Sequence, residues 1–230
     1  MKRQGKEAGF SLVELMIAMT VMLLALGIVS MVLSRAMAVK ARESRTADAL
    51  ATAQAAISVL SREISNSGFG LYTDNFNKKA SNGIVTAESN AHRIRVLSNV
   101  DHSGGVETDT DPLALRMLTP GEDVTYFFDA TTSSIVRYDP HGVETSPGVY
   151  GPQTSVVVNR ISNVTFEYFD YAGGTSQAVG PSAAPTVDTA RVRITVDVEL
   201  DQVFGQPNTQ HVIFASDVTL RNNSYMLTQY

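Results

Sequence analysis

The chain lacks cysteine and tryptophan entirely, and only 18% of its 230 residues are charged. The absence of cysteine excludes a disulfide scaffold, a thiolate metal site and a cysteine nucleophile. The low charged fraction, beside 43% hydrophobic residues, excludes a mostly disordered chain. A chain of this length suits one medium-sized domain, or one domain with an appendage.

Charge is also missing from one continuous stretch, Leu15 to Ser34, which holds 20 residues. About 20 apolar residues let a helix span the hydrocarbon core of a membrane. Residues 1–9, just before this region, carry three basic side chains and one acidic one. Because basic flanks favour the cytoplasmic side, we expect one membrane crossing, with the N-terminus in the cytoplasm and the bulk of the chain outside it.

Two simpler interpretations of this stretch are a cleaved secretory signal and a plain membrane anchor. A signal peptide has an apolar region of roughly 7–15 residues, which is shorter than the run found here. No clear small-x-small cleavage site ends the run, although Ser34-Arg35-Ala36 comes near. Neither interpretation explains the acidic residue Glu14 at the start of the apolar segment.

Glu14 is costly in a membrane, because a carboxylate at the centre of a spanning helix costs about 2.5–3.5 kcal/mol, and less near the end. The segment offers no cation nearby. Cleavage between Gly9 and Phe10 would create one, an α-amine at the start of the helix. The helix holds this amine a full turn from Glu14 of the same chain, so Glu14 of a neighbouring chain is the better partner. The alternative is that Glu14 simply reaches the headgroups.

The segment Gly9-Phe10-Ser11-Leu12-Val13-Glu14-Leu15-Met16-Ile17-Ala18 resembles the prepilin motif of type IV pilins and pseudopilins. The resemblance implies cleavage after Gly9 by a prepilin peptidase and N-methylation of Phe10. It also implies that Glu14 meets the Phe10 amine of an adjacent subunit during filament assembly. The chain would then be a substrate of the peptidase and a partner of other pilin subunits through its N-terminal helix. Its expected location is the bacterial inner membrane, with the head in the periplasm, and then a pilus at the cell surface.

The predicted helix continues beyond the membrane, from Phe10 to Asn66, since no proline occurs before Pro112. Its second half carries an apolar stripe at spacings of three and four, made of Leu50, Ala53, Ile57, Leu60 and Ile64. Ser65-Asn66-Ser67-Gly68 is a helix stop. We therefore expect a leader at 1–9, a membrane-spanning and filament-core helix at 10–34, and an amphipathic helix at 35–66. A coiled coil is the alternative for the stripe, but sustained heptads are lacking.

The end of this helix carries a second resemblance. Leu60-Ser61-Arg62-Glu63-Ile64, followed by Ser67-Gly68-Phe69-Gly70, is similar to PilW-type minor pilins, which have an Arg-acid-Ile step and then a Gly-aromatic turn. The alternative is an ordinary amphipathic helix with a glycine cap. The two motifs together cover about the first 70 residues of the chain.

Residues 67–230 form the predicted head, and apolar alternation marks its strands. The expected strands are Arg93–Leu97, Leu113–Met117, Val124–Phe128, Ile135–Tyr138, one around Val164 to Tyr168, Arg191–Asp201 and His211–Leu220. We expect the last two to form a hairpin, and long surface loops at 140–155 and 172–189. The fold class is α+β and pilin-like, with the long helix packed on an antiparallel sheet.

Enzyme chemistry is not expected in the head. The four histidines, at 92, 102, 141 and 211, show no metal-binding spacing, and no nucleophile elbow or phosphate loop is present. Glu107, Asp109 and Asp111 alternate as calcium ligands do. Pro112, however, stands where a calcium loop needs glycine, so a solvated acidic loop is favoured. We expect no metal and no cofactor.

The charge of the head bears on its partners. Residues 67–230 contain ten basic and eighteen acidic side chains, which gives a net charge of −8. Because nucleic-acid binding depends on neutralising phosphates, we expect no nucleic-acid partner. The sequence favours a minor pilin of a type IV pilus. Three alternatives stay open: a type II secretion pseudopilin, a permanently anchored periplasmic binding domain, and an envelope enzyme.

Overall fold

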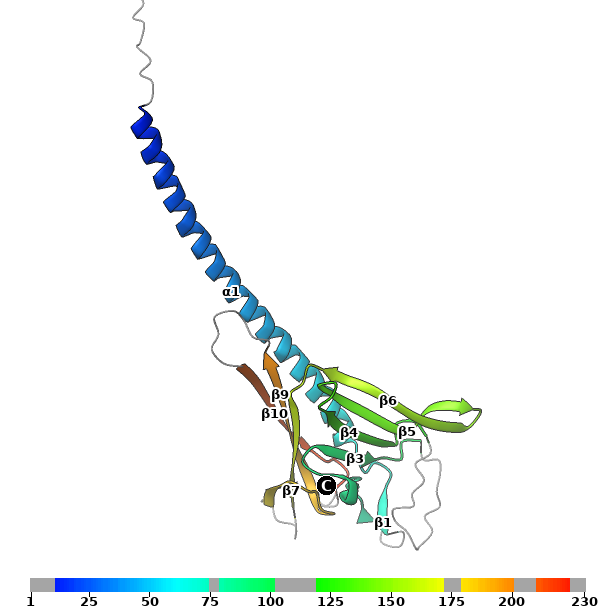
Figure 1. The fold of residues 1–230 in the computed structure, drawn as a ribbon. Coiled ribbons are helices and arrows are strands. Elements are labelled where there is room, and N and C mark those ends of the chain that lie inside the picture. Colours follow the sequence, from blue (N-terminus) through cyan, green and yellow to red (C-terminus); the bar gives the residue numbers. More distant parts are fainter. Residues whose placement is uncertain (1–10, 75–78, 102–118, 172–178, 201–209, 224–230) are drawn as a thin grey trace, which may run out of the picture.

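The computed structural model describes residues 11–74, 79–101, 119–171, 179–200 and 210–223. A long N-terminal helix stands out from a β-rich head, and only its C-terminal part packs on that head (Figure 1). The α+β, pilin-like fold class expected from the sequence is therefore confirmed. The predicted strand Leu113–Met117 lies outside the described residues.

Helix α1 spans Leu12–Ser65, so its ends lie within two residues of the predicted ones. Its 54 residues extend about 80 Å at 1.5 Å per residue. At the C-terminal end, the Asn66 backbone N–H donates to the Glu63 carbonyl oxygen at 3.2 Å, and the Ser67 N–H donates to the Ile64 carbonyl oxygen at 3.1 Å. Gly68 follows with φ +77°, and a Cβ there would collide with the Ser81 carbonyl oxygen. The predicted helix stop is therefore confirmed, because this position accepts only glycine without strain.

The head contains two four-stranded antiparallel sheets and not the single sheet expected. One sheet has the order β3-β4-β5-β6, with bounds Arg93–Leu97, Asp123–Asp129, Ser134–Ser146 and Val149–Asn159. The other has the order β10-β9-β7-β8, with bounds Gln210–Thr219, Thr189–Leu200, Asn163–Asp170 and Val179–Ser182. A two-stranded sheet, β1 (Tyr72–Asp74) with β2 (Lys79–Ala80), and the 3-10 turn η1 (Thr86–Glu88) complete the described elements. Hydrophobic periodicity reveals strands but not how they divide between sheets, which explains the error.

The predicted C-terminal hairpin is confirmed, since β9 pairs antiparallel with β10 and Val196 lies opposite Phe214. β9 is an internal strand of its sheet, because its other edge pairs with β7. Its inward residues are fully or almost fully buried: Val192, Ile194, Val196 and Val198. Its outward residues are charged or polar and form cross-strand ion pairs such as Arg193–Asp217. The alternation in the sequence is thus the alternation of the two sheet faces.

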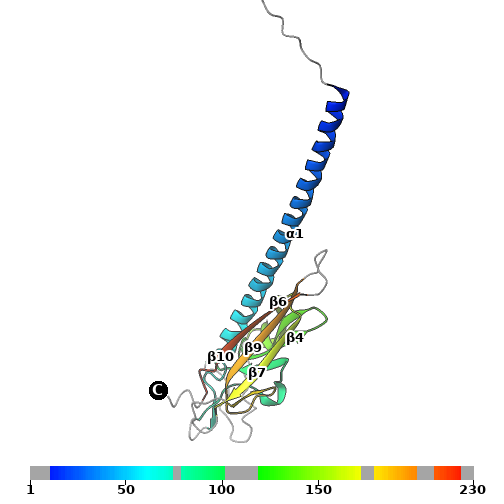
Figure 2. The ribbon, with the colours of Figure 1, turned by 90° about the vertical axis from the view of Figure 1, so that its left-hand side faces the viewer.

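One continuous core lies between α1 and the two sheets (Figures 1 and 2). The buried helix residues are Ala49, Ala53, Ala56, Ile57, Leu60 and Ile64. Leu50, which the sequence placed in this stripe, is 37% exposed. It lies about 100° around the helix from Ala49, and small alanines occupy the contact instead because they let the helix approach the strands. Since the head's own strands cover this stripe, it is not a coiled-coil seam.

The predicted loop at 140–155 is wrong, because β5 and β6 run through it as one long hairpin. The turn lies at Gly148, which has φ +73°. Pro140 and Pro152 suggested a loop, but proline is tolerated at bulges and in edge strands. Both conditions hold, since the β5–β6 register shifts between Asp139 and Val143, and β6 is the last strand of its sheet. The predicted loop at 172–189 likewise contains a short strand, β8.

Candidate assembly site on the N-terminal helix

The predicted site consists of Gly9, Phe10 and Glu14. Gly9 and Phe10 lie outside the described residues, so the processing and methylation positions remain predictions. Glu14 is described and lies in the first turn of α1. The first turn of a helix has N–H groups without intrahelical partners and a partial positive charge, which favours a carboxylate there.

Glu14 forms no ion pair within the part of the chain that the structure describes. Ser11, the residue that caps the helix, makes no side-chain hydrogen bond to it, although its carbonyl oxygen accepts the Leu15 N–H at 3.1 Å. The carboxylate is solvent-exposed beside large apolar side chains. The geometry therefore leaves Glu14 available to a cation of another molecule.

The helix around Glu14 presents apolar side chains on all sides. Leu12 is 76% exposed, and every residue from there to Met37 is exposed. This helix is long and apolar enough to cross a membrane, and it is the one such helix among the described residues. Thr20, a polar residue in this run, donates its hydroxyl to the Ile17 carbonyl oxygen at 2.8 Å. Such a bond removes most of the cost of placing a hydroxyl among apolar groups. The surface of this segment is thus suited to contact with lipid or with other helices.

The described histidines of the head lie on separate elements. His92 bonds the Val164 carbonyl oxygen through Nδ1 at 3.0 Å, and His211 bonds Asp197 at 2.9 Å. His141 lies in β5 with its Nδ1 buried and without a hydrogen-bond partner. No group of three potential metal ligands exists within the described ranges. His102 and the weak calcium candidates Glu107, Asp109 and Asp111 lie outside them.

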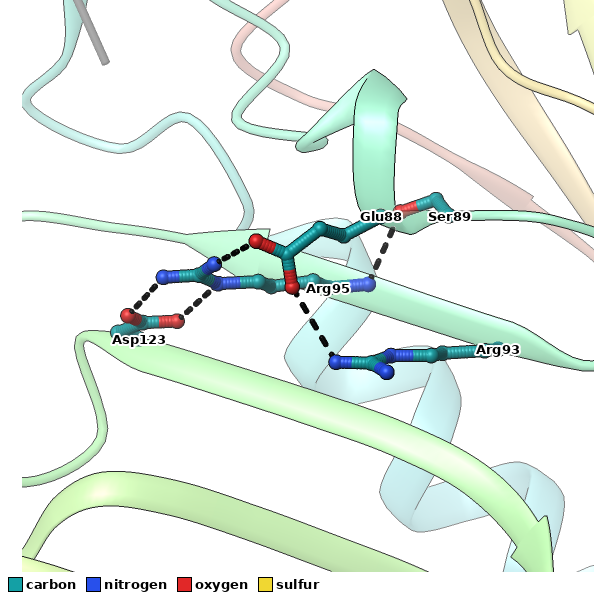
Figure 3. A network of polar contacts seen from close by, with 5 residues as sticks. All are labelled: Glu88, Ser89, Arg93, Arg95 and Asp123. Atoms are coloured by element: carbon teal, nitrogen blue, oxygen red, sulfur yellow. Dashed lines mark hydrogen bonds and ion pairs between the residues drawn. The ribbon is translucent and has the colours of Figure 1, made fainter.

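The sequence did not reveal a polar network that joins β3, β4 and η1 (Figure 3). Arg95 donates to both carboxylate oxygens of Asp123, at 2.8 and 2.6 Å, and also binds Glu88. Glu88 accepts a second bond from Arg93 at 3.2 Å. The hydrogen bond to Asp123 is the main reason that the pKa of Arg95 is raised. The Arg95 guanidinium therefore binds partners inside the head, and the network holds the edge strand β3 to β4 and η1. Arg93 and Arg95 alternate along the predicted strand, but their acceptors come from elements that only the fold brings near.

A cavity of about 480 Å³ lies where α1 leaves the head, between the β4–β5 turn and the end of β9. Its charged lining residues are Arg45 and Asp48 from α1, Arg160 after β6, and Glu199 from β9. Two cations and two acids balance each other, so the lining selects neither an anion nor a cation. The sequence could not identify this group, because the two helix residues precede Arg160 and Glu199 by more than 100 positions.

One family model matches the chain, the prokaryotic N-terminal methylation motif, over residues 4–30. No curated protein and no solved structure matches the chain. The match includes Gly9, Phe10 and Glu14 and implies processing by a prepilin peptidase and assembly with other pilins. Such proteins are structural subunits, which is consistent with a chain that is not an enzyme. The motif, the apolar N-terminal helix and the β-rich head together support a type IV pilin-like or pseudopilin-like precursor and fit an anchor in the inner membrane.

Proposed function

We propose that the chain is a PilW-type minor pilin of a type IV pilus. In this proposal residues 1–9 are a leader, 10–34 span the inner membrane and later line the filament core, and 35–66 join this segment to the head at 67–230. A prepilin peptidase cleaves after Gly9, and Phe10 is then N-methylated. The head faces the periplasm until the subunit enters or primes a filament. The observation that carries the proposal is the methylation motif at the start of a long exposed apolar helix.

Assembly follows from the electrostatics of the helix start. Cleavage creates an α-amine at Phe10, and Glu14 has no cation partner in the described part of its own chain. A carboxylate in apolar surroundings gains most from a partner that is also desolvated. Docking the Phe10 amine of one subunit on Glu14 of the next therefore selects the axial register, while helix packing supplies the contact area.

Replacing the Glu14 side chain tests this mechanism. We expect Glu14→Ala to insert into the membrane normally, because it removes a polar group from an apolar segment, and to enter filaments poorly. The measurement is the ratio of membrane-bound to filament-bound protein by immunoblot. Glu43→Ala is the matched control, since it removes a carboxylate from the exposed helix beyond the apolar run. Filament incorporation of Glu14→Ala at the level of Glu43→Ala would contradict the assembly role.

The same motif equally fits a type II secretion pseudopilin. The two functions differ in the phenotype of a strain that lacks the chain. We expect such a strain to lose or reduce surface pili and to secrete its exoproteins normally. Lost secretion with normal pili would favour the pseudopilin. A permanently anchored binding domain would instead retain residues 1–9.

A further inference from the structure

Three basic side chains follow the apolar run on the exposed part of α1: Arg35, Lys40 and Arg42, named here the neck cations. All three are solvent-exposed, and none forms an ion pair with the described residues of the head or helix. Glu43 is the single acid between residues 35 and 47. The neck is thus a cationic segment of a chain whose net charge is −5.

Most of the head arginines that the structure describes behave differently. Five of them have a carboxylate within 4.0 Å: Arg93, Arg95, Arg137, Arg191 and Arg193. Their charges are balanced by acids within the fold, whereas the structure shows no such acid beside the neck cations among the residues it describes. The neck also precedes Ala49, the first residue of α1 that is buried.

The position of the neck cations matches a lipid headgroup layer. Arg35 directly follows Ser34, the last residue of the uncharged run, and Arg42 lies about 12 Å beyond Ser34 along the helix at 1.5 Å per residue. The headgroup region adds roughly 5–8 Å on each side of the hydrocarbon core. Side chains on a helix lean toward its N-terminus, which here is toward the membrane. Arginine and lysine stems can therefore carry all three cations back to the phosphates.

We propose that the neck cations bind anionic phospholipid headgroups at the outward face of the inner membrane and so set the depth at which the helix sits. The membrane orientation in this proposal rests on the proposed function. The neck cations do not serve to orient the helix in the membrane. Basic residues that do so lie on the cytoplasmic side, whereas the neck lies on the opposite side. Phosphate is the fitting ligand, since it accepts hydrogen bonds from both guanidinium and ammonium groups.

The absence of tryptophan allows a direct test with the full chain. Leu33→Trp places a single fluorophore in the last turn of the uncharged run, where Leu33 is 53% exposed. The labelled chain is reconstituted in phosphatidylcholine vesicles that contain brominated phosphatidylglycerol or brominated phosphatidylcholine, and fluorescence quenching gives the relative association of the two lipids. Each cation near an anionic surface contributes about fivefold. We expect the anionic lipid to be preferred several-fold, and less so in 1 M salt.

A charge-matched pair of variants decides whether the neck is responsible. In the Leu33→Trp background, Arg35→Gln/Lys40→Gln/Arg42→Gln should reduce the preference to nearly 1. Arg62→Gln/Arg160→Gln/Arg221→Gln removes the same charge from exposed positions at the end of α1 and in the head, and it should leave the preference unchanged. Equal quenching by both lipids in the parent chain, or a preference that survives in the neck variant, would overturn the proposal. Because the vesicles contain neither peptidase nor filament, this result is independent of whether residues 1–9 are cleaved in cells.

Discussion

Two buried tyrosines differ in a single hydrogen bond. Tyr126 and Tyr168 are both fully buried, and each faces the core from a central strand. The Tyr168 hydroxyl donates to the Asn90 carbonyl oxygen at 3.0 Å, whereas the Tyr126 hydroxyl has no hydrogen-bond partner. Burial raises the pKa of Tyr126 to about 12 and raises the pKa of Tyr168 as well. Both hydroxyls thus lose water on folding, and within the described residues only the Tyr168 hydroxyl gains a hydrogen bond of standard geometry.

The pair predicts opposite effects of removing the hydroxyl. Tyr168→Phe should lower the free energy of unfolding of the head by about 0.5–1.5 kcal/mol, the usual net value of one hydrogen bond. Tyr126→Phe should leave it unchanged or raise it by up to about 1 kcal/mol, because it removes an unsatisfied buried group. Thermal unfolding of the full chain in detergent, followed by circular dichroism, measures both. A larger loss in Tyr126→Phe than in Tyr168→Phe would contradict the described hydrogen bonding.

Among single residues, the sequence revealed those whose role depends only on neighbouring positions in the chain. The apolar neighbours of Glu14 and the stop at Gly68 can be identified from adjacent residues alone. The pairing of Arg95 with Asp123 could not be predicted, because the two residues are 28 positions apart and meet only when β3 pairs with β4. The unpartnered hydroxyl of Tyr126 depends on the whole core and has no sequence signal.

Among the elements, α1 shows how far periodicity determines packing. The stripe was predicted with Leu50 inward, but the buried face begins at Ala49 and includes Ala56. A prediction from hydrophobic periodicity gives most weight to large side chains. Where the helix lies closest to the sheets, however, small side chains occupy the contact. In the β5–β6 hairpin, a loop was predicted where strands are found. Its prolines and glycines are typical of a loop, but backbone pairing continues through Gly151.

The register of α1 on the sheets predicts unequal effects for two leucines. Leu60 is fully buried in the core, and Leu50 is 37% exposed. Leu60→Ala should therefore cost about 2–5 kcal/mol of unfolding free energy. Leu50→Ala should cost less than about 1 kcal/mol, as surface substitutions do. Chemical denaturation of the two variants in the same detergent compares them directly. Equal losses would mean that the helix packs in another register.

For the whole molecule, the sequence separates two parts with different surroundings. The exposed apolar half of α1 has no contact that would stabilise it in water, while the head has its own core. The charge-free run predicted this division, while alternating strands, turn residues and the pilin resemblance predicted an antiparallel head. The arrangement of the strands in two sheets could not be predicted, because it depends on which strand edges pair over long sequence separations. The proposed function in turn rests on the N-terminal part of the chain, where the methylation motif matches residues 4–30.

The central claim is that cleavage after Gly9 gives Glu14 its cation on another subunit. It is tested most directly by mass spectrometry of the N-terminal peptide from filaments sheared off the cell surface. We predict a chain that begins at N-methylated Phe10, and a Gly9→Val variant that stays full length in the membrane. Gly27→Val is the matched control, because a Cβ at Gly27 meets nothing within 4 Å, and it should be processed normally. A filament-borne chain that still begins at Met1, or one cut beyond Ser34, would contradict the account.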